Sequence, residues 1–205
     1  MPTATDTPTP CWPPEYSGHK TQVGAVFLLQ GGALSGSQDL KSLPVIEGID
    51  GYDELGESLD LIGDLDGDGE DELLLGAPKA EEEDGDSEGE AYVVALSAVR
   101  DGSADLSAAE TWRGVAADDH AGERVSRAGD VNGDGYADAI IGAPDADPSG
   151  EVYLILGSAS RPDDASLSQA DATFFGDGEK YAGQTLSAAG DADGDGLADF
   201  AIAAT

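Results

Sequence analysis

One stretch rich in aspartate and glycine occurs three times, and it constrains the fold of this chain more than any other feature. The first copy reads Asp-Leu-Asp-Gly-Asp-Gly-Glu-Asp-Glu at 64–72. The second reads Asp-Val-Asn-Gly-Asp-Gly-Tyr-Ala-Asp at 130–138, and the third Asp-Ala-Asp-Gly-Asp-Gly-Leu-Ala-Asp at 191–199. The copies start 66 and then 61 residues apart, and each precedes a short apolar run. This regularity predicts a chain built from a repeating unit.

The spacing of oxygen-bearing side chains in this stretch is typical of a calcium-binding loop. Carboxylate or amide oxygens occupy loop positions 1, 3, 5 and 9, and glycines occupy positions 4 and 6. Calcium takes about six to eight oxygen ligands at about 2.3–2.6 Å, and glycine permits the tight coiling that gathers them from few residues. Position 7 varies in residue type, which suits a ligand supplied by the backbone carbonyl. We predict three Ca²⁺ sites with the following ligands: Asp64, Asp66, Asp68, Glu70 and Glu72; Asp130, Asn132, Asp134, Tyr136 and Asp138; Asp191, Asp193, Asp195, Leu197 and Asp199.

Three other interpretations of these loops can be weighed from the sequence. An EF-hand shares the first five positions but requires a glutamate at position 12 and flanking helices. Position 12 is Leu75, Ile141 or Ile202, each within an apolar run short enough to be a buried strand. A dockerin-like pair would have closer repeats leading into helices, and the remaining alternative is three acidic turns that bind no ion. The flanking runs favour calcium loops within β-hairpins.

Composition narrows the class of protein and its partners. The 205 residues include 29 glycines, which favours many turns and short strands over helices. The formal net charge of −34, from 43 acidic and 9 basic residues, argues against binding to nucleic acid or an anionic membrane. A solvating surface and a high-salt habitat both remain open as causes of the acidity. No stretch reaches the roughly 18 apolar residues of a membrane span, so we expect no membrane insertion.

No constellation in the sequence is typical of an enzyme. A nucleophile elbow, a phosphate-binding loop and zinc-ligand spacing are absent, and acids are too abundant to indicate a glycosidase. His19 and His120 are interpreted as surface residues. Cys11 is the only cysteine, which excludes an internal disulfide. It lies in a Pro/Thr-rich linker or arm over 1–22, which has neither the basic nor the apolar region of a signal peptide. We therefore expect no enzymatic activity in this segment.

A second recurring element completes the repeat. Gly-Ala-Val-Phe at 24–27, Gly-Glu-Ala-Tyr at 89–92 and Gly-Glu-Val-Tyr at 150–153 each read as the start of a strand. A repeat of this length with about four short antiparallel strands predicts a β-propeller blade, with the calcium loop between its first two strands. We expect an all-β segment over 23–205, with the following divisions: half blade 23–48, blade 49–114, blade 115–176 and half blade 177–205.

Together these motifs resemble the FG-GAP repeats that build the seven-bladed β-propeller of integrin α subunits. The matching features are the acidic loops, Gly-Ala-Pro at 76–78 and 142–144, and Gly-Glu-Val-Tyr at 150–153. Two departures are that Leu55, Ala121 and Ala182 replace the phenylalanine of the Phe-Gly step, and that Glu72 replaces an aspartate.

The resemblance implies an extracellular or cell-surface module for adhesion or protein interaction, with an unidentified protein or glycan ligand. Its calcium ions would be structural, because gathered carboxylates repel one another without a cation and binding stabilises the folded loop by mass action. An alternative is the non-catalytic propeller part of a larger secreted hydrolase. Two blades and two half blades are fewer than the four or more of a closed propeller. A fragment of a longer propeller, a ring completed by self-association and an open arc all remain open.

Overall fold

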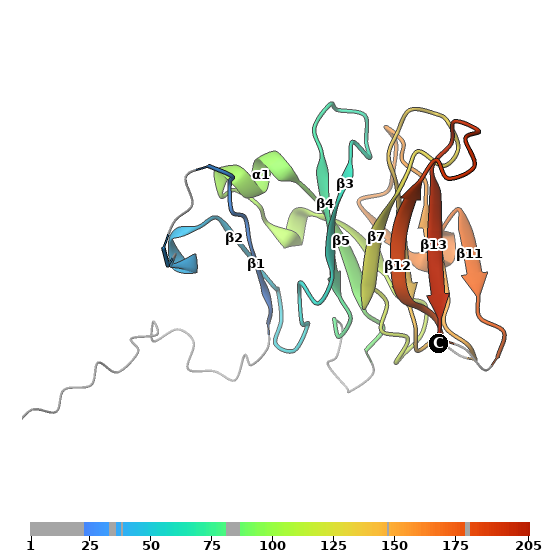
Figure 1. The fold of residues 1–205 in the computed structure, drawn as a ribbon. Coiled ribbons are helices and arrows are strands. Elements are labelled where there is room, and N and C mark those ends of the chain that lie inside the picture. The colour runs from blue at the N-terminus through green and yellow to red at the C-terminus, as the bar shows by residue number, and fades with distance from the viewer. Residues whose placement is uncertain (1–22, 33–35, 38, 81–86, 147, 179–180) are drawn as a thin grey trace, which may run out of the picture.

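The computed structural model describes residues 23–32, 36–37, 39–80, 87–146, 148–178 and 181–205. These residues form four sheets that follow one another side by side in chain order (Figure 1). The predicted all-β fold of propeller-blade type is confirmed, and the described sheets form an arc rather than a closed ring (Figure 1). The predicted linker with Cys11 and His19 lies outside the described residues.

The two central sheets have the strand order expected of propeller blades. In each, four strands pair antiparallel with their neighbours, and the chain runs through them in order from one edge. The second sheet contains β3 (Leu59–Gly63), β4 (Glu72–Ala77), β5 (Glu90–Ala95) and β6 (Glu110–Arg113). The third sheet contains β7 (Arg124–Gly129), β8 (Asp138–Ala143), β9 (Glu151–Ile155) and β11 (Ala172–Phe175).

The first and fourth sheets each contain two antiparallel strands. The first pairs β1 (Ala25–Phe27) with β2 (Val45–Glu47), and the fourth pairs β12 (Ala182–Gly190) with β13 (Asp199–Ala204). By their place in the repeat, β1 and β2 correspond to β5 and β6, whereas β12 and β13 correspond to β3 and β4. The two small sheets therefore hold complementary halves of the blade pattern.

The helices in the described residues are few and short. Among them are the 3₁₀ helices η2 (Leu40–Ser42), η3 (Leu106–Ala108) and η4 (Leu167–Gln169). Each begins after a side chain that accepts a hydrogen bond from a backbone N–H: Asp39, Asp105 and Ser166. The sequence did not predict the one α-helix in the described residues, α1 (Leu96–Asp101), which ends at Gly102 with φ +72°. No helix in the described part of the chain is both long and apolar enough to cross a bilayer.

Alternating side chains of one strand pack against different neighbouring sheets. In β4, Leu74 belongs to the core shared with the third sheet, whereas Leu73 and Leu75 belong to the core shared with the first. In β8, Ile141 faces the second sheet and Ile140 faces the fourth. All six residues of both strands are buried. Because both faces are covered, these strands appear in the sequence as apolar runs without polar alternation.

The glycine that opens each recurring Gly-x-Val-Tyr element is required by a close approach between sheets. Gly89 and Gly150 have φ of +77° and +74°. A Cβ atom would lie 2.3 Å from the Ala121 carbonyl oxygen at Gly89, and 2.4 Å from that of Ala182 at Gly150. Ala121 and Ala182, which replace the family phenylalanine, are buried at these contacts. Any side chain here would separate one sheet from the next.

A fifth strand joins the second sheet from an unexpected part of the chain. β10 (Asp164–Ser166) follows β9 in sequence but pairs parallel with β6 of the preceding sheet. An ion pair between Arg113 Nη1 and Asp164 Oδ1, 2.7 Å long, accompanies this pairing. The second and third sheets are thereby interlocked through strand hydrogen bonds as well as through packed side chains.

Candidate metal centres

The three acidic loops lie at the same edge of the arc, shown at the top of Figure 1. Each connects the first two strands of its sheet: β3 to β4, β7 to β8, and β12 to β13. Because the strands pair antiparallel, each loop is the turn of a β-hairpin. This placement agrees with the sequence prediction that the loops sit within hairpins and not between helices.

All three loops share one pattern of side-chain to backbone hydrogen bonds. In the first loop, Asp64 Oδ1 and Oδ2 accept from the N–H groups of Gly67 and Gly69 at 2.7 and 3.0 Å. Asp66 accepts from Asp68 N–H at 3.0 Å, and Asp68 accepts from Glu70 N–H at 2.8 Å. The equivalent bonds in the other two loops are 2.7–3.0 Å long. The backbone is thereby coiled with acidic side chains at regular intervals.

The residue at loop position 9 closes each loop by accepting from the N–H at position 2. Glu72 accepts from Leu65 at 2.7 Å, Asp138 from Val131 at 2.8 Å, and Asp199 from Ala192 at 2.7 Å. This bond joins the start of the second strand to the start of the loop. The carboxylate at position 9 is therefore held at the start of its own loop.

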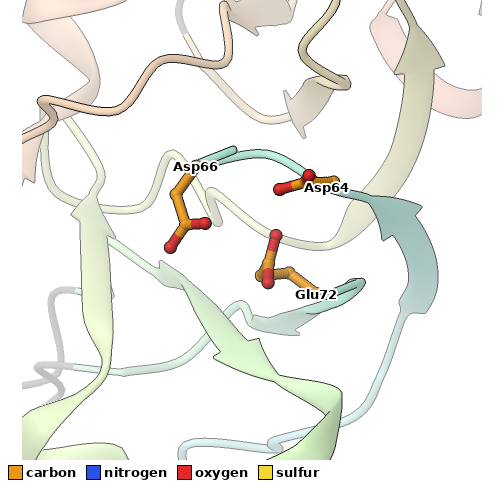
Figure 2. Close-up of side chains that lie close together, drawn as sticks. All are labelled: Asp64, Asp66 and Glu72. Carbon is orange, nitrogen blue, oxygen red and sulfur yellow. The ribbon is translucent and has the colours of Figure 1, made fainter. Parts of the chain in front are cut away.

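Two loops bring three carboxylates within the span of one cation. Oxygens of Asp64, Asp66 and Glu72 all lie within 4.8 Å of one another, with the side chains turned toward a common point (Figure 2). The following residues of the third loop form an equivalent group: Asp191, Asp193 and Asp199. Two oxygens on opposite sides of one calcium ion are about 4.8 Å apart, because each bond is about 2.4 Å. Both groups fit a single Ca²⁺ ion.

Some predicted ligands are not part of these two groups. Asp68 and Asp195, at position 5, do not join them at this distance. In the second loop, position 3 is an amide, and Asn132 Nδ2 donates to Asp134 Oδ2 at 2.9 Å. At position 7 of the second and third loops, Tyr136 and Leu197 pack against glycines of the preceding loops, which the sequence did not reveal. The full list of fifteen ligands stays a prediction.

Glu72 is the most unusual acid of the three loops. Its residue is 3% exposed, and its Oε1 atom is buried without a hydrogen-bond partner in the described structure. Burial raises the pKa of this carboxyl to about 7, and the neighbouring charges of Asp66, Asp68 and Asp64 add to the effect, against the lowering influence of the Leu65 N–H. A buried acceptor without a partner is costly, and a bound cation would satisfy it.

Asp138 provides the contrasting case in the second loop. It is fully buried, and burial raises its pKa above the ordinary value. Both of its oxygens, however, accept backbone hydrogen bonds: Oδ2 from Val131 and Oδ1 from Gly157, each 2.8 Å long. The two N–H groups favour the ionised carboxylate and oppose the effect of burial. At position 9, the first loop therefore has a carboxylate oxygen without a hydrogen-bond partner in the described structure, whereas both oxygens of the second loop's carboxylate have one.

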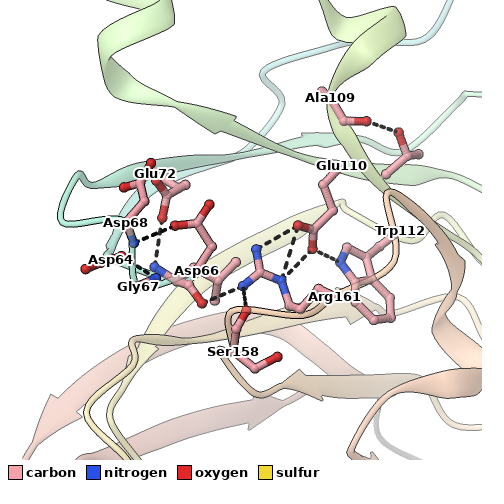
Figure 3. A network of polar contacts seen from close by, with 12 residues as sticks. Asp64, Asp66, Gly67, Asp68, Glu72, Ala109, Glu110, Trp112, Ser158 and Arg161 are labelled. Carbon is pink, nitrogen blue, oxygen red and sulfur yellow. Dashed lines mark hydrogen bonds and ion pairs between the residues drawn. The ribbon is translucent and has the colours of Figure 1, made fainter.

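An arginine in the connection between β9 and β10 contacts the outside of the first loop. Arg161 pairs with Glu110, with Nη2–Oε2 at 2.7 Å and Nε–Oε1 at 3.0 Å, and Trp112 Nε1 donates to the same carboxylate at 2.9 Å (Figure 3). Arg161 also donates to the carbonyl oxygens of Leu65 and Ser158. The sequence analysis missed this residue. The one feature of the sequence that could have drawn attention to Arg161 is that the chain has only nine Lys and Arg residues.

His120 is the histidine within the described residues. Its Nδ1 lies 2.8 Å from Asp145 Oδ2, and its side chain is 26% exposed. His120 is partly exposed, as expected of a surface residue, and Asp145 lies against its ring.

Comparison with known proteins identifies the repeat. A family model described as "FG-GAP repeat" matches residues 56–94 and 121–155, which span the first two acidic loops and their flanking strands. The chain carries FG-GAP repeats. The resemblance stated from the sequence is confirmed, and the propeller-blade architecture agrees with it.

The curated relatives of this FG-GAP segment include integrin α subunits. It is 34% identical to integrin alpha-PS3 of Drosophila melanogaster over 75% of the chain, and 32% identical to integrin alpha-4 of Xenopus laevis over 69%. It is 30% identical to integrin alpha-E of Homo sapiens over 92% of the chain. The chain spans 13%, 13% and 16% of the length of these three relatives.

Proposed function

We propose that this FG-GAP segment is a calcium-stabilised β-propeller module for adhesion or protein interaction, working outside the cell or at its surface. The ions would be structural and the segment non-catalytic. Each sheet would correspond to one blade or half blade, and the acidic loops would be its cation sites.

The observation that carries this proposal is the state of Glu72. Its Oε1 atom is buried without a hydrogen-bond partner in the described structure, and one oxygen of its carboxylate lies within 4.8 Å of oxygens from Asp64 and Asp66. Three carboxylates this close repel one another, and burial adds to the cost of ionising Glu72. A calcium ion neutralises such a group and accepts several oxygens at once.

The residues that would hold the ions follow from the loop pattern. Carboxylates or amides at positions 1, 3, 5 and 9 would supply side-chain oxygens, and position 7 would supply a backbone carbonyl. When bound, the ion supplies a cross-link between the two strands of its hairpin. Extracellular calcium modules bind in the range of about 10⁻⁴–10⁻³ M. If the three loops bind in that range, their sites would be filled outside cells and nearly empty in a cytosol.

The role in interaction is supported by the integrin α relatives and by the incomplete arc. The sheets β1–β2 and β12–β13 hold complementary halves of one blade. Further blades of a longer chain, or a second copy of this one, would complete them. A completed propeller presents its loops on two broad faces, where a protein or glycan ligand would bind.

A thermal melt followed by circular dichroism tests the calcium role. We expect a cooperative transition that moves upward by several degrees between excess chelator and millimolar calcium. Asp66→Ala should reduce this shift, because it removes one ligand from the first loop. Asp101→Asn is the matched control, since it removes an equal charge from an exposed residue of α1 outside the loops. No calcium-dependent shift in the unmodified protein would overturn the proposal.

A further inference from the structure

The first and second acidic loops are joined through one peptide unit. The N–H of Ala137, at position 8 of the second loop, donates to the carbonyl oxygen of Asp64 in the first loop at 2.9 Å. The same peptide unit carries the carbonyl of Tyr136, the predicted position-7 ligand of the second loop. One rigid, planar group therefore contacts both loops. The third loop repeats the link, with Ala198 N–H donating to the Asp130 carbonyl at 2.9 Å.

Side-chain packing reinforces this junction. A Cβ atom at Gly67 would lie 2.4 Å from Cε1 of the Tyr136 ring, so the ring rests directly on the first loop. A Cβ atom at Gly63 would lie 3.1 Å from that of Ala137. The conformation of the first loop therefore depends on where the second loop places Tyr136.

A second connection runs between the position-9 acids of the two loops. Gly157 N–H donates to Asp138 Oδ1 at 2.8 Å, and the next N–H, of Ser158, donates to the Leu65 carbonyl at 3.0 Å. Leu65 N–H in turn donates to Glu72 Oε2 at 2.7 Å. Two adjacent backbone N–H groups thus connect the closing acid of the second loop to that of the first.

Arg161 fixes this second connection in place. It donates to the carbonyl of Leu65. It also donates, at 3.1 Å, to the carbonyl of Ser158 (Figure 3). Its side chain is 8% exposed, and its bidentate pair with Glu110 anchors it to β6. The connection is therefore held by buried, charge-assisted hydrogen bonds, which are stronger than neutral ones.

We propose that the second blade positions the first acidic loop, so that the two loops bind cations as a coupled pair. This inference rests on the proposed function. A cation in the second loop restrains the Tyr136 carbonyl and Asp138, and the partners of both groups restrain Asp64, Leu65 and Glu72. The conformational entropy lost on ordering the shared groups is lost once, so the second cation binds with a smaller penalty. Coupling is reciprocal, and each loop raises the affinity of the other by the same factor.

Site-resolved NMR titration of the full chain with calcium tests this proposal. The amide signals of Gly67 and Gly69 report the first loop, because both N–H groups bind Asp64. Those of Gly133 and Gly135 report the second loop, because both bind Asp130. Asp134→Ala would disable the second loop at an exposed position. We expect the calcium affinity of the first loop to fall about fivefold or more in this variant, the lower end of typical coupling.

The reciprocal variant and a matched control sharpen the result. Asp66→Ala should lower the affinity of the second loop by the same factor that Asp134→Ala lowers that of the first. Asp195→Ala is the equivalent change in the third loop. It should lower the calcium affinity of the first loop less, because in the described part of the chain the third loop contacts the second loop and reaches the first only through it. Asn132→Ala replaces Asp134→Ala if the latter disturbs signals outside its own loop.

Two results would overturn the proposed coupling, and only the second would also overturn calcium binding. A first-loop affinity within twofold of the unmodified value in the loop-disabled variant refutes coupling but leaves calcium binding intact. Absence of any calcium-dependent change in the glycine signals of the unmodified chain refutes the proposed function as well.

Discussion

Glu72→Gln should change the stability of the protein in opposite directions with and without calcium. Without the ion, the substitution removes a buried negative charge that the structure leaves partly unpaired. The glutamine oxygen can still accept from Leu65 N–H, and its amide group gains Asp64 and Asp66 as acceptors within reach. With calcium, the same substitution weakens the cation site of the first loop.

The magnitude follows from the pKa of Glu72. A rise from 4.5 to about 7 corresponds to about 3 kcal/mol above pH 7, at 1.36 kcal/mol per pH unit. The loop faces solvent, which screens the neighbouring charges, so we take about half of this value, about 1.5 kcal/mol. For a chain of this size, 1 kcal/mol corresponds to about 2–4 °C, so the melting temperature should rise by about 3–6 °C in chelator at pH 8.

Asp138→Asn is the matched control for this experiment. Asp138 occupies the same loop position, but both of its oxygens accept backbone N–H groups. Asparagine would turn a donor toward one of those N–H groups and leave it unsatisfied, so this variant should be less stable in both buffers by about 1–3 kcal/mol. Thermal melts of both variants at pH 8, in chelator and in calcium, decide the matter. If Glu72→Gln lowers the melting temperature in chelator, the reasoning on the unpaired oxygen is refuted.

Three further predictions follow from contacts described above. In chelator, the free energy of unfolding should fall as pH rises from about 4.5 to about 7, because folded Glu72 retains a proton that the unfolded chain has lost. Urea denaturation of the unmodified protein and of Glu72→Gln isolates this contribution, and millimolar calcium should reduce the pH dependence of the unmodified protein. Arg161→Ala should lower the unfolding free energy by about 3–5 kcal/mol, because it leaves the largely buried Glu110 carboxylate unpaired, whereas Arg161→Met combined with Glu110→Leu should recover most of the loss. Equal losses of stability in the two variants would contradict this explanation. Gly89→Ala should destabilise by more than Gly102→Ala, because both have positive φ but only Gly89 faces a backbone oxygen 2.3 Å from the added Cβ; similar urea midpoints would show that the sheets can separate at little cost.

Sequence patterns of short range predicted the strands and the loops well. The hairpin placement of the acidic loops follows from apolar runs beside a fixed spacing of acids and glycines, and both signals lie within about fifteen residues. The glycine at position 89 was visible as part of a recurring element, although its reason, a close approach to Ala121, was not. Local patterns suffice where the structure is determined by neighbouring residues.

Contacts between blades were not predictable in the same way. β10 pairs with β6 across more than fifty residues, and Arg161 meets Leu65 across 96. No spacing rule in a single sequence links such positions. The depth of Glu72 was also hidden, because the sequence shows a longer side chain at position 9 but not that its second oxygen is enclosed. The α1 helix was missed because its six residues are too few to display helical periodicity, although Gly102 marks its end.

The pairing of β10 with β6 of the preceding sheet has a consequence for synthesis on the ribosome. The second sheet gains its fifth strand only when residues 164–166 have emerged, about fifty residues after β6. The apolar side chains of β4 and β5 that face the third sheet likewise stay uncovered until β7–β9 are made. The second sheet is therefore completed by segments translated after it, and until then the nascent chain exposes apolar side chains of β4 and β5.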